Sequence, residues 1–181
     1  MIVAPKSKLL KQRQGDAPTI VQILPAMVRG GVERGAVEMA DAIQKHGGRA
    51  IVISRGGPMV RHLDRLGVKH YQLDVHTKNP FRWPQVRRRL KAILSRENAD
   101  LVHVRSRVPA WIALPAAAVL GIATVSTVHG RFIALSALKR MYNRKLLKTD
   151  HVIAISNYVK DLITNQYVDV KERLTVVHRG V

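Results

Sequence analysis

Short apolar runs rich in β-branched residues alternate along the chain with segments whose apolar residues recur at helical spacing. The runs predict strands at Thr19–Leu24, Ala50–Ser54, Lys69–Leu73, Asp100–Val104, Ala123–Val128, His151–Ile155 and Leu174–Val177. The segments between them predict helices at Val32–His46, Pro58–Gly67, Gln85–Glu97, Ala110–Leu120, Ala137–Lys148 and Ser156–Asn165. This alternation predicts a parallel sheet with helices on both faces, a doubly wound, Rossmann-like α/β fold.

One uncharged stretch, Val108 to Val128, is long enough to be considered as a membrane-spanning helix. Pro109, Pro115 and Gly121 interrupt it, and its last third changes to β-branched residues. We therefore interpret it as a buried helix followed by a buried strand.

The length of 181 residues fits one globular domain, which we place at residues 18–181. Residues 1–17 contain Lys6, Lys8 and Lys11 but lack the apolar core of a secretory signal, so we expect a disordered basic arm. The chain has no cysteine, which excludes disulfide scaffolds and thiol catalysis and fits a reducing cytoplasm.

Basic residues outnumber acidic ones by 31 to 12, giving a formal net charge of +19. Such a charge indicates an anionic partner, namely nucleic acid, acidic lipid headgroups or phosphorylated metabolites. Nucleic acid is the weaker choice, because aromatic residues make up only 4% and no helix-turn-helix, RNP or KH pattern is present.

Ligands of doubly wound sheets bind beyond the carboxyl ends of the strands, so the residues that follow each strand are the candidates for chemistry. A glycine pair after the first strand lets a ligand approach the backbone closely. The sequence GGVERG is not the dinucleotide-binding motif GxGxxG. The alternative interpretation is that the two glycines do no more than allow a tight turn. A histidine that follows the fifth strand could hydrogen-bond a ligand or carry a proton, or be structural. The two arginines after the fourth strand could bind phosphate, or form a solvated basic loop, and the arginine after the fifth strand adds positive charge. These residues are Gly30, Gly31, Arg105, Ser106, Arg107, His129 and Arg131.

The predicted helix at Ala137–Lys148 carries basic residues together with apolar ones such as Leu138 and Met141, a composition that suits contact with anionic lipid headgroups. It also fits an ordinary charged surface helix. The basic residues that we assign to the membrane are Lys139, Arg140, Arg144 and Lys145. No ligand spacing typical of a metal site is present, so we expect no metal and no other cofactor.

Several of these motifs, in this order, resemble the retaining glycosyltransferases of family 4, which are two-domain enzymes of the GT-B fold. The motifs are ILPAMVRGGVERGAVEMADAI, ADLVHVRSRVPAW, STVHGRF, VIAISNYVKDLI and the terminal VVHRGV. GGVER together with RSRVPAW is most similar to the branch that builds lipopolysaccharide-type surface glycans.

The resemblance implies that the chain is the amino-terminal, acceptor-side half of such an enzyme. It places Gly30 and Gly31 near the donor diphosphate, His129 near the donor sugar, and Arg105, Ser106, Arg107 and Arg131 in the acceptor cleft. The implied partners are a nucleotide-sugar donor, a lipid-linked or saccharide acceptor, and an anionic membrane surface. The implied location is cytoplasmic, peripheral at the inner face of the plasma membrane.

The family's donor-binding residues, including its E-x7-E motif, belong to a carboxyl-terminal domain that would follow Val181. We therefore expect these 181 residues alone to be inactive. The alternatives are a basic α/β module that binds nucleic acid or an anionic membrane, and an inactive half-domain.

Overall fold

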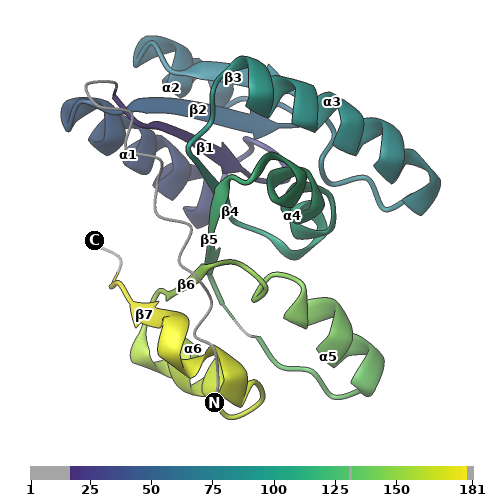
Figure 1. Cartoon of the computed structure of the whole chain (residues 1–181). Helices are drawn as coiled ribbons and strands as arrows, with labels where there is room; N and C mark the ends of the chain where they lie inside the picture. Colours follow the sequence, from purple (N-terminus) through teal and green to yellow (C-terminus); the bar gives the residue numbers. More distant parts are fainter. Residues whose placement is uncertain (1–16, 131, 179–181) are drawn as a thin grey trace.

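The computed structural model describes residues 17–130 and 132–178, which form a parallel sheet covered by helices. The sheet order is β3-β2-β1-β4-β5-β6-β7, and every neighbouring pair is parallel. The strands are β1 (Thr19–Ile23), β2 (Arg49–Ser54), β3 (Lys69–Gln72), β4 (Leu101–Val104), β5 (Ala123–Val128), β6 (His151–Ala154) and β7 (Leu174–Val176). The doubly wound α/β prediction is therefore confirmed (Figure 1).

The helices alternate with the strands as the hydrophobic pattern predicts. They are α1 (Gly31–Lys45), α2 (Val60–Arg65), α3 (Trp83–Arg96), α4 (Arg107–Leu120), α5 (Ala137–Arg144) and α6 (Asn157–Thr164), with 3₁₀ turns η1 (Pro80–Arg82) and η2 (Val168–Arg173). The two 3₁₀ turns were not predicted from the sequence. The basic arm predicted at residues 1–17 lies outside the described residues, except for Ala17.

Two apolar cores lie on opposite faces of the sheet. Ala36, Ala40 and Leu63 belong to the core beneath α1 and α2. The larger core buries one face each of α3 and α4, through residues such as Leu90 and Ile112. In Figure 1, α3 and α4 lie side by side. Tyr142 of α5 stacks on Trp111 of α4. Burial on both faces explains why most strands are continuous apolar runs.

The uncharged stretch 108–128 divides into a helix and a strand, as predicted. Gly121 ends α4 with φ 68°, the left-handed conformation that glycine adopts without strain. The helix begins earlier than predicted, at Arg107, because Pro109 lies in its first turn, where a missing N–H costs no helical hydrogen bond. Among the described residues, no helix is long and apolar enough to cross a membrane.

Candidate functional site at the carboxyl edge of the sheet

The strand order reverses between β1 and β4, because the chain adds β2 and β3 on one side of β1 and β4 to β7 on the other. At such a switch point the loops after the two central strands diverge and leave room for a ligand. The glycine pair follows β1, and Arg105 and Ser106 follow β4. His129 follows β5, the next strand along the sheet.

The loop between β1 and α1 is fixed by the neighbouring loop between β2 and α2. Met27 N donates to the carbonyl oxygen of Gly56 at 2.9 Å, and Met59 N donates to the carbonyl oxygen of Met27 at 2.8 Å. Gly57 has φ 144°, and a Cβ there would collide with the Met27 carbonyl. Only glycine fits this close contact between the two backbones, so the β1–α1 and β2–α2 loops together form one rigid unit at the carboxyl edge of the sheet.

The exposed pair Gly30 and Gly31 begins α1. Gly30 is the N-cap residue, and no side chain of the described residues caps the helix. The first N–H groups of α1 therefore face outward with the positive end of the helix dipole, an arrangement suited to a phosphate. The Glu33 carboxylate stands in this first turn, close to Gly30, so an anionic ligand would have to displace it.

Arg105 points into the fold rather than into solvent. Its Nη1 donates to Gln22 Oε1 at 2.5 Å and to the carbonyl oxygen of Gly35 at 3.2 Å. Gln22 Nε2 in turn donates to the carbonyl oxygen of Ala36 at 2.9 Å. The arginine after β4 thus fixes α1, the helix that carries the glycine pair, and its predicted contact with an acceptor stays a prediction.

The residues that follow Arg105 take other directions. Ser106 is the N-cap residue of α4, and the Arg107 guanidinium lies 4.8 Å from the ring centroid of Phe132. Arg131 lies outside the described residues. The sequence reasoning grouped these residues as one cleft, whereas the structure directs Arg105 toward α1 and Arg107 toward Phe132.

His129 is half-buried, and Gly130 beside it is exposed. A second histidine, His103 in β4, is buried, and its Nε2 lies 2.7 Å from Thr127 Oγ1. Burial, with the charges of Arg105 and His129, lowers the pKa of His103 to about 3, so its imidazole is neutral in the cell. Sequence reasoning missed His103 and Gln22. Each is a polar residue within an apolar strand, a pattern that could have indicated a buried hydrogen-bonding side chain.

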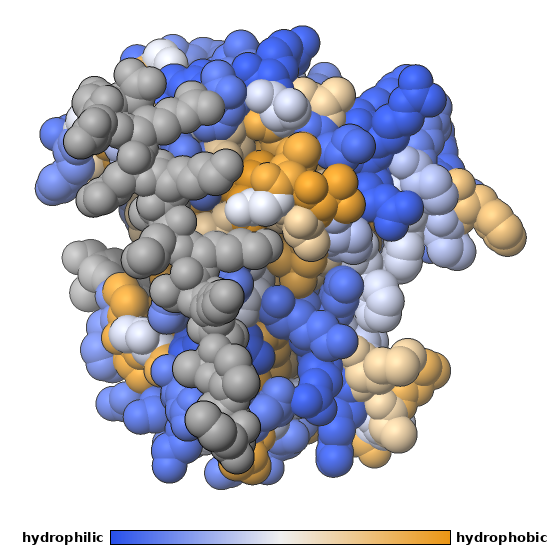
Figure 2. Space-filling model, in the orientation of Figure 1, coloured by the Kyte–Doolittle hydropathy of each residue, from blue (hydrophilic) through white to orange (hydrophobic). Residues whose placement is uncertain are grey.

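The surface of α5 combines apolar and basic side chains. Leu135 before the helix is 96% exposed, Leu138 72% and Met141 57%. Figure 2 shows hydrophobic atoms, in orange, at the surface where α5 lies in Figure 1, at the lower right. Lys139 and Arg140 are exposed on this helix. Exposed leucine and methionine beside basic residues are typical of a surface that binds lipid.

The other two basic residues assigned to the membrane make contacts within the fold. Arg144 Nη2 lies 2.8 Å from Asp169 Oδ2. Lys145 Nζ lies 5.4 Å from the ring centroid of Trp111, and burial, with Lys148 nearby, lowers the pKa of Lys145. Lys139 Nζ also lies over a ring, 5.4 Å from the centroid of Tyr142, but Lys139 is exposed whereas Lys145 is half-buried. Lys139 and Arg140 are therefore the better placed of the four for contact with headgroups.

No group of three or more histidine, aspartate or glutamate side chains that could hold a metal ion occurs within residues 17–130 and 132–178. The expectation that the reaction uses no metal stays a prediction.

Comparison with known proteins identifies a family and several similar structures. Residues 29–181 match the family model described as Glycosyltransferase Family 4. A glycosyltransferase from Rickettsia africae ESF-5 is 36% identical, with a TM-score of 0.80 over 91% of this chain and 44% of that one. No curated protein matched.

Two more distant structures share the fold. HepE of Anabaena, in complex with UDP-glucose, is 15% identical, with a TM-score of 0.71 over 90% of this chain and 44% of its own. The lipopolysaccharide outer core galactosyltransferase WaaB, in its apo form, is 18% identical, with a TM-score of 0.68 over 90% of this chain and 46% of its own. The chain therefore spans less than half the length of these GT-B glycosyltransferases.

Proposed function

Because the chain belongs to glycosyltransferase family 4, we propose that it is the acceptor-side half of an enzyme that transfers a sugar from a nucleotide-sugar to an acceptor with retention. In this reaction the bond from the anomeric carbon to the diphosphate oxygen breaks, the bond to an acceptor hydroxyl oxygen forms, and the hydroxyl proton passes to the departing diphosphate. The UDP-glucose complex of HepE supports a nucleotide-sugar as donor. WaaB supports a lipid-linked or saccharide acceptor of the lipopolysaccharide type.

The observation that carries the proposal is the glycine pair at the start of α1, exposed at the switch point of the sheet and joined to a rigid loop. Once the Glu33 carboxylate is displaced, the backbone N–H groups of this turn, already held in place, bind the diphosphate and stabilise the negative charge that grows there as the sugar leaves. His129, two strands away along the same edge, is proposed to hydrogen-bond the donor sugar.

The test compares two histidines on opposite edges of the sheet, in a two-domain enzyme that joins this half to a donor-binding domain. We expect His129→Ala to lower kcat at least 100-fold, whereas His151→Ala, an exposed histidine at the start of β6, changes kcat less than twofold. Circular dichroism of both variants checks the fold. Equal activity of the two variants would remove His129 from the site, and no transfer from any of a panel of nucleotide-sugars would contradict the proposed activity.

We further propose that the protein binds peripherally to the cytoplasmic face of an anionic membrane, where a lipid-linked acceptor is found. The supporting observation is the exposed apolar and basic surface of α5, formed by Leu135, Leu138, Lys139, Arg140 and Met141. Cationic side chains gain attraction from anionic headgroups while the apolar ones enter the interface. Binding to phosphatidylglycerol vesicles by variants of α5 tests this proposal.

A further inference from the structure

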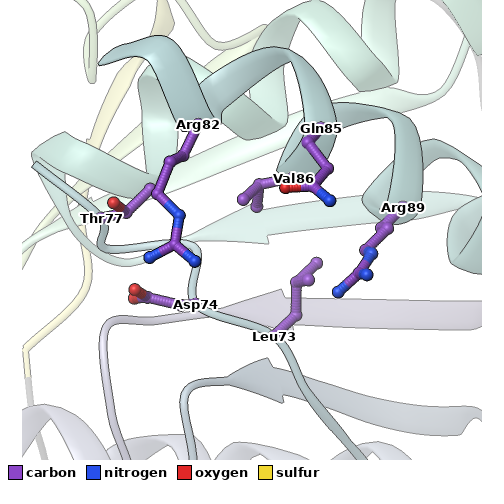
Figure 3. A pocket seen from close by; sticks show the side chains of 7 residues that line it. All are labelled: Leu73, Asp74, Thr77, Arg82, Gln85, Val86 and Arg89. Carbon is purple, nitrogen blue, oxygen red and sulfur yellow. The ribbon is translucent and has the colours of Figure 1, made fainter. Parts of the chain in front are cut away.

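A pocket of about 100 Å³ lies at the carboxyl end of β3, between the segment that follows this strand and the beginning of α3 (Figure 3). Leu73 and Val86 supply its apolar part. Three polar side chains reach the pocket from η1 and α3, namely Arg82, Gln85 and Arg89. Their spacing of three and four residues places them on one side of the helix that begins beside Arg82.

The backbone around this pocket is fixed by hydrogen bonds. Trp83 Nε1 donates to the carbonyl oxygen of Thr77 at 2.9 Å, which ties the start of α3 to the segment after β3. Asn79 Oδ1 accepts from Phe81 N at 3.0 Å and caps η1. Arg82 therefore leaves a rigid turn, whereas its own side chain, like that of Arg89, is exposed.

Two guanidiniums share this small space with one carboxylate. Figure 3 shows Arg82 and Arg89 directed toward the pocket, with Asp74 on the opposite wall facing Arg82. The balance of charge is positive, so a cation is disfavoured and an anion is favoured. Guanidiniums bind tetrahedral phosphate through paired N–H groups, and Gln85 and Thr77 offer further donors.

We propose that this pocket binds a phosphate group of a small molecule that reaches the carboxyl edge of the sheet. β3 is the second strand from β1, so the two strands lie about 10 Å apart. The phosphate belongs to a phosphorylated sugar, to a lipid headgroup or to free phosphate, which share this chemistry. The proposal goes beyond sugar transfer, and its failure would leave the role of the glycine pair and His129 untouched.

The indole N–H of Trp83 reports on the pocket from beside it, because it donates to the carbonyl oxygen of Thr77, a lining residue. We would titrate the full chain with inorganic phosphate, glucose 6-phosphate and monomeric dihexanoyl phosphatidylglycerol, and follow this N–H in ¹H–¹⁵N spectra. Backbone N–H signals of α6, which packs against β6, β7 and η2, serve as the internal reference, because Trp111 stacks on Trp83 and would shift with it. We expect saturable shifts of the Trp83 signal, and the tightest of the three ligands identifies the source of the phosphate. No saturable shift with any of them would overturn the proposal.

Because the chain is strongly basic, the control must remove the same charge from the same helix. Arg82→Gln/Arg89→Gln is expected to weaken phosphate affinity at least tenfold. Arg87→Gln/Arg88→Gln, at exposed positions outside the pocket, is expected to change it less than twofold. If both double variants weakened phosphate affinity equally, phosphate would be attracted by net charge alone. This result would overturn the proposal of a phosphate site in the pocket.

Asp74→Asn gives a test of opposite sign. The variant removes the negative charge from the pocket and keeps an oxygen that can accept from His76 N, as Asp74 Oδ1 does at 3.3 Å. We expect phosphate to bind about fivefold more tightly, a gain that damage to the fold would not produce. Weaker binding would contradict an anion site.

Discussion

The Nη1 atom of Arg49 lies 2.6 Å from Oε2 of Glu97 and so joins the start of β2 to the end of α3. Lys69 Nζ approaches the other carboxylate oxygen at 2.8 Å, and the Tyr71 hydroxyl donates to that same oxygen. Glu97 is only 5% exposed. This cluster lies at the amino edge of the sheet, opposite the candidate site, so its contribution is to stability.

Acid should release this contribution over a defined range of pH. Hydrogen bonds from Lys69 and Tyr71 lower the pKa of Glu97 from 4.5 to about 2. A carboxyl whose pKa is lower in the folded state stabilises the fold fully above pH 4.5, and this stabilisation is lost as the pH falls toward 2. We expect the wild-type free energy of unfolding to lose about 3 kcal/mol from this group over that range.

The Glu97→Gln variant isolates the group. We expect a cost of about 2 kcal/mol at pH 7 and a flatter dependence on pH between 4.5 and 2, measured by urea unfolding. Glu172→Gln, at an exposed position, is the matched control and should stay within about 0.5 kcal/mol of wild type. If both variants unfold alike, the cluster does not stabilise the fold.

Gly57→Ala should loosen the rigid unit formed by the two loops. The φ of 144° strains any other residue, and the new methyl group would collide with the Met27 carbonyl. We expect a loss of about 3 kcal/mol in the free energy of unfolding. In Gly130→Ala, no described atom lies within 4 Å of the new Cβ, so stability should change by less than about 0.5 kcal/mol. If the two variants were similarly stable, the loops would not depend on the close contact between Gly57 and the Met27 carbonyl for their stability.

Gln22 and Arg105 should be energetically coupled. Gln22→Met takes one acceptor from a buried guanidinium, and Arg105→Met takes a donor from a buried amide, so each should cost about 2 kcal/mol. In the double variant both the amide and the guanidinium are gone, so neither is left buried without the other. Its cost in urea unfolding should be at least about 1 kcal/mol below the sum of the two single costs. Simple additivity would mean that the contact between the two side chains contributes no coupling.

Binding to membranes should depend on α5. We expect Lys139→Glu/Arg140→Glu to weaken binding to phosphatidylglycerol vesicles at least about 30-fold in a sedimentation assay, since each lost basic residue contributes about 1 kcal/mol and the new carboxylates are repelled by the headgroups. Arg61→Glu/Arg65→Glu makes the same charge change at exposed positions of α2. Equal loss in both pairs would indicate attraction by net charge without a defined surface.

Separate substitution of the apolar side chains tests whether α5 enters the interface. Leu138→Gln/Met141→Gln keeps the charge, so any loss of binding reports apolar contact alone. We expect a loss of at least tenfold, and undiminished binding would limit the contact to headgroup charges.

The order of strands and helices could be predicted because local signals agree with the tertiary arrangement. The β-branched run Ala123–Val128 becomes β5 with the predicted bounds, and Gly121 ends the helix before it. The start of α4 was predicted three residues late, because Pro109 was treated as a helix breaker. A proline breaks a helix only where its N–H is needed, which depends on where the helix begins.

The interior contacts of the candidate site could not be predicted, because they depend on how the strands are paired. Gln22 and Arg105 are 83 residues apart in the chain, and they meet because β1 and β4 are neighbours. The pocket after β3 was missed for a related reason. The helix was predicted to begin at Gln85, which left Arg82 outside the pattern that places it beside Arg89.

The aromatic rings on α3, α4 and α5 form a stack whose signal is easy to read. Trp83 and Trp111 lie 5.8 Å apart between ring centroids, and Trp111 and Tyr142 lie 6.5 Å apart. Since these are the two tryptophans of the chain, the tryptophan fluorescence of the protein reports on this one place. A ligand in the neighbouring pocket, or a bilayer that displaces α5, would therefore change the emission without any added label.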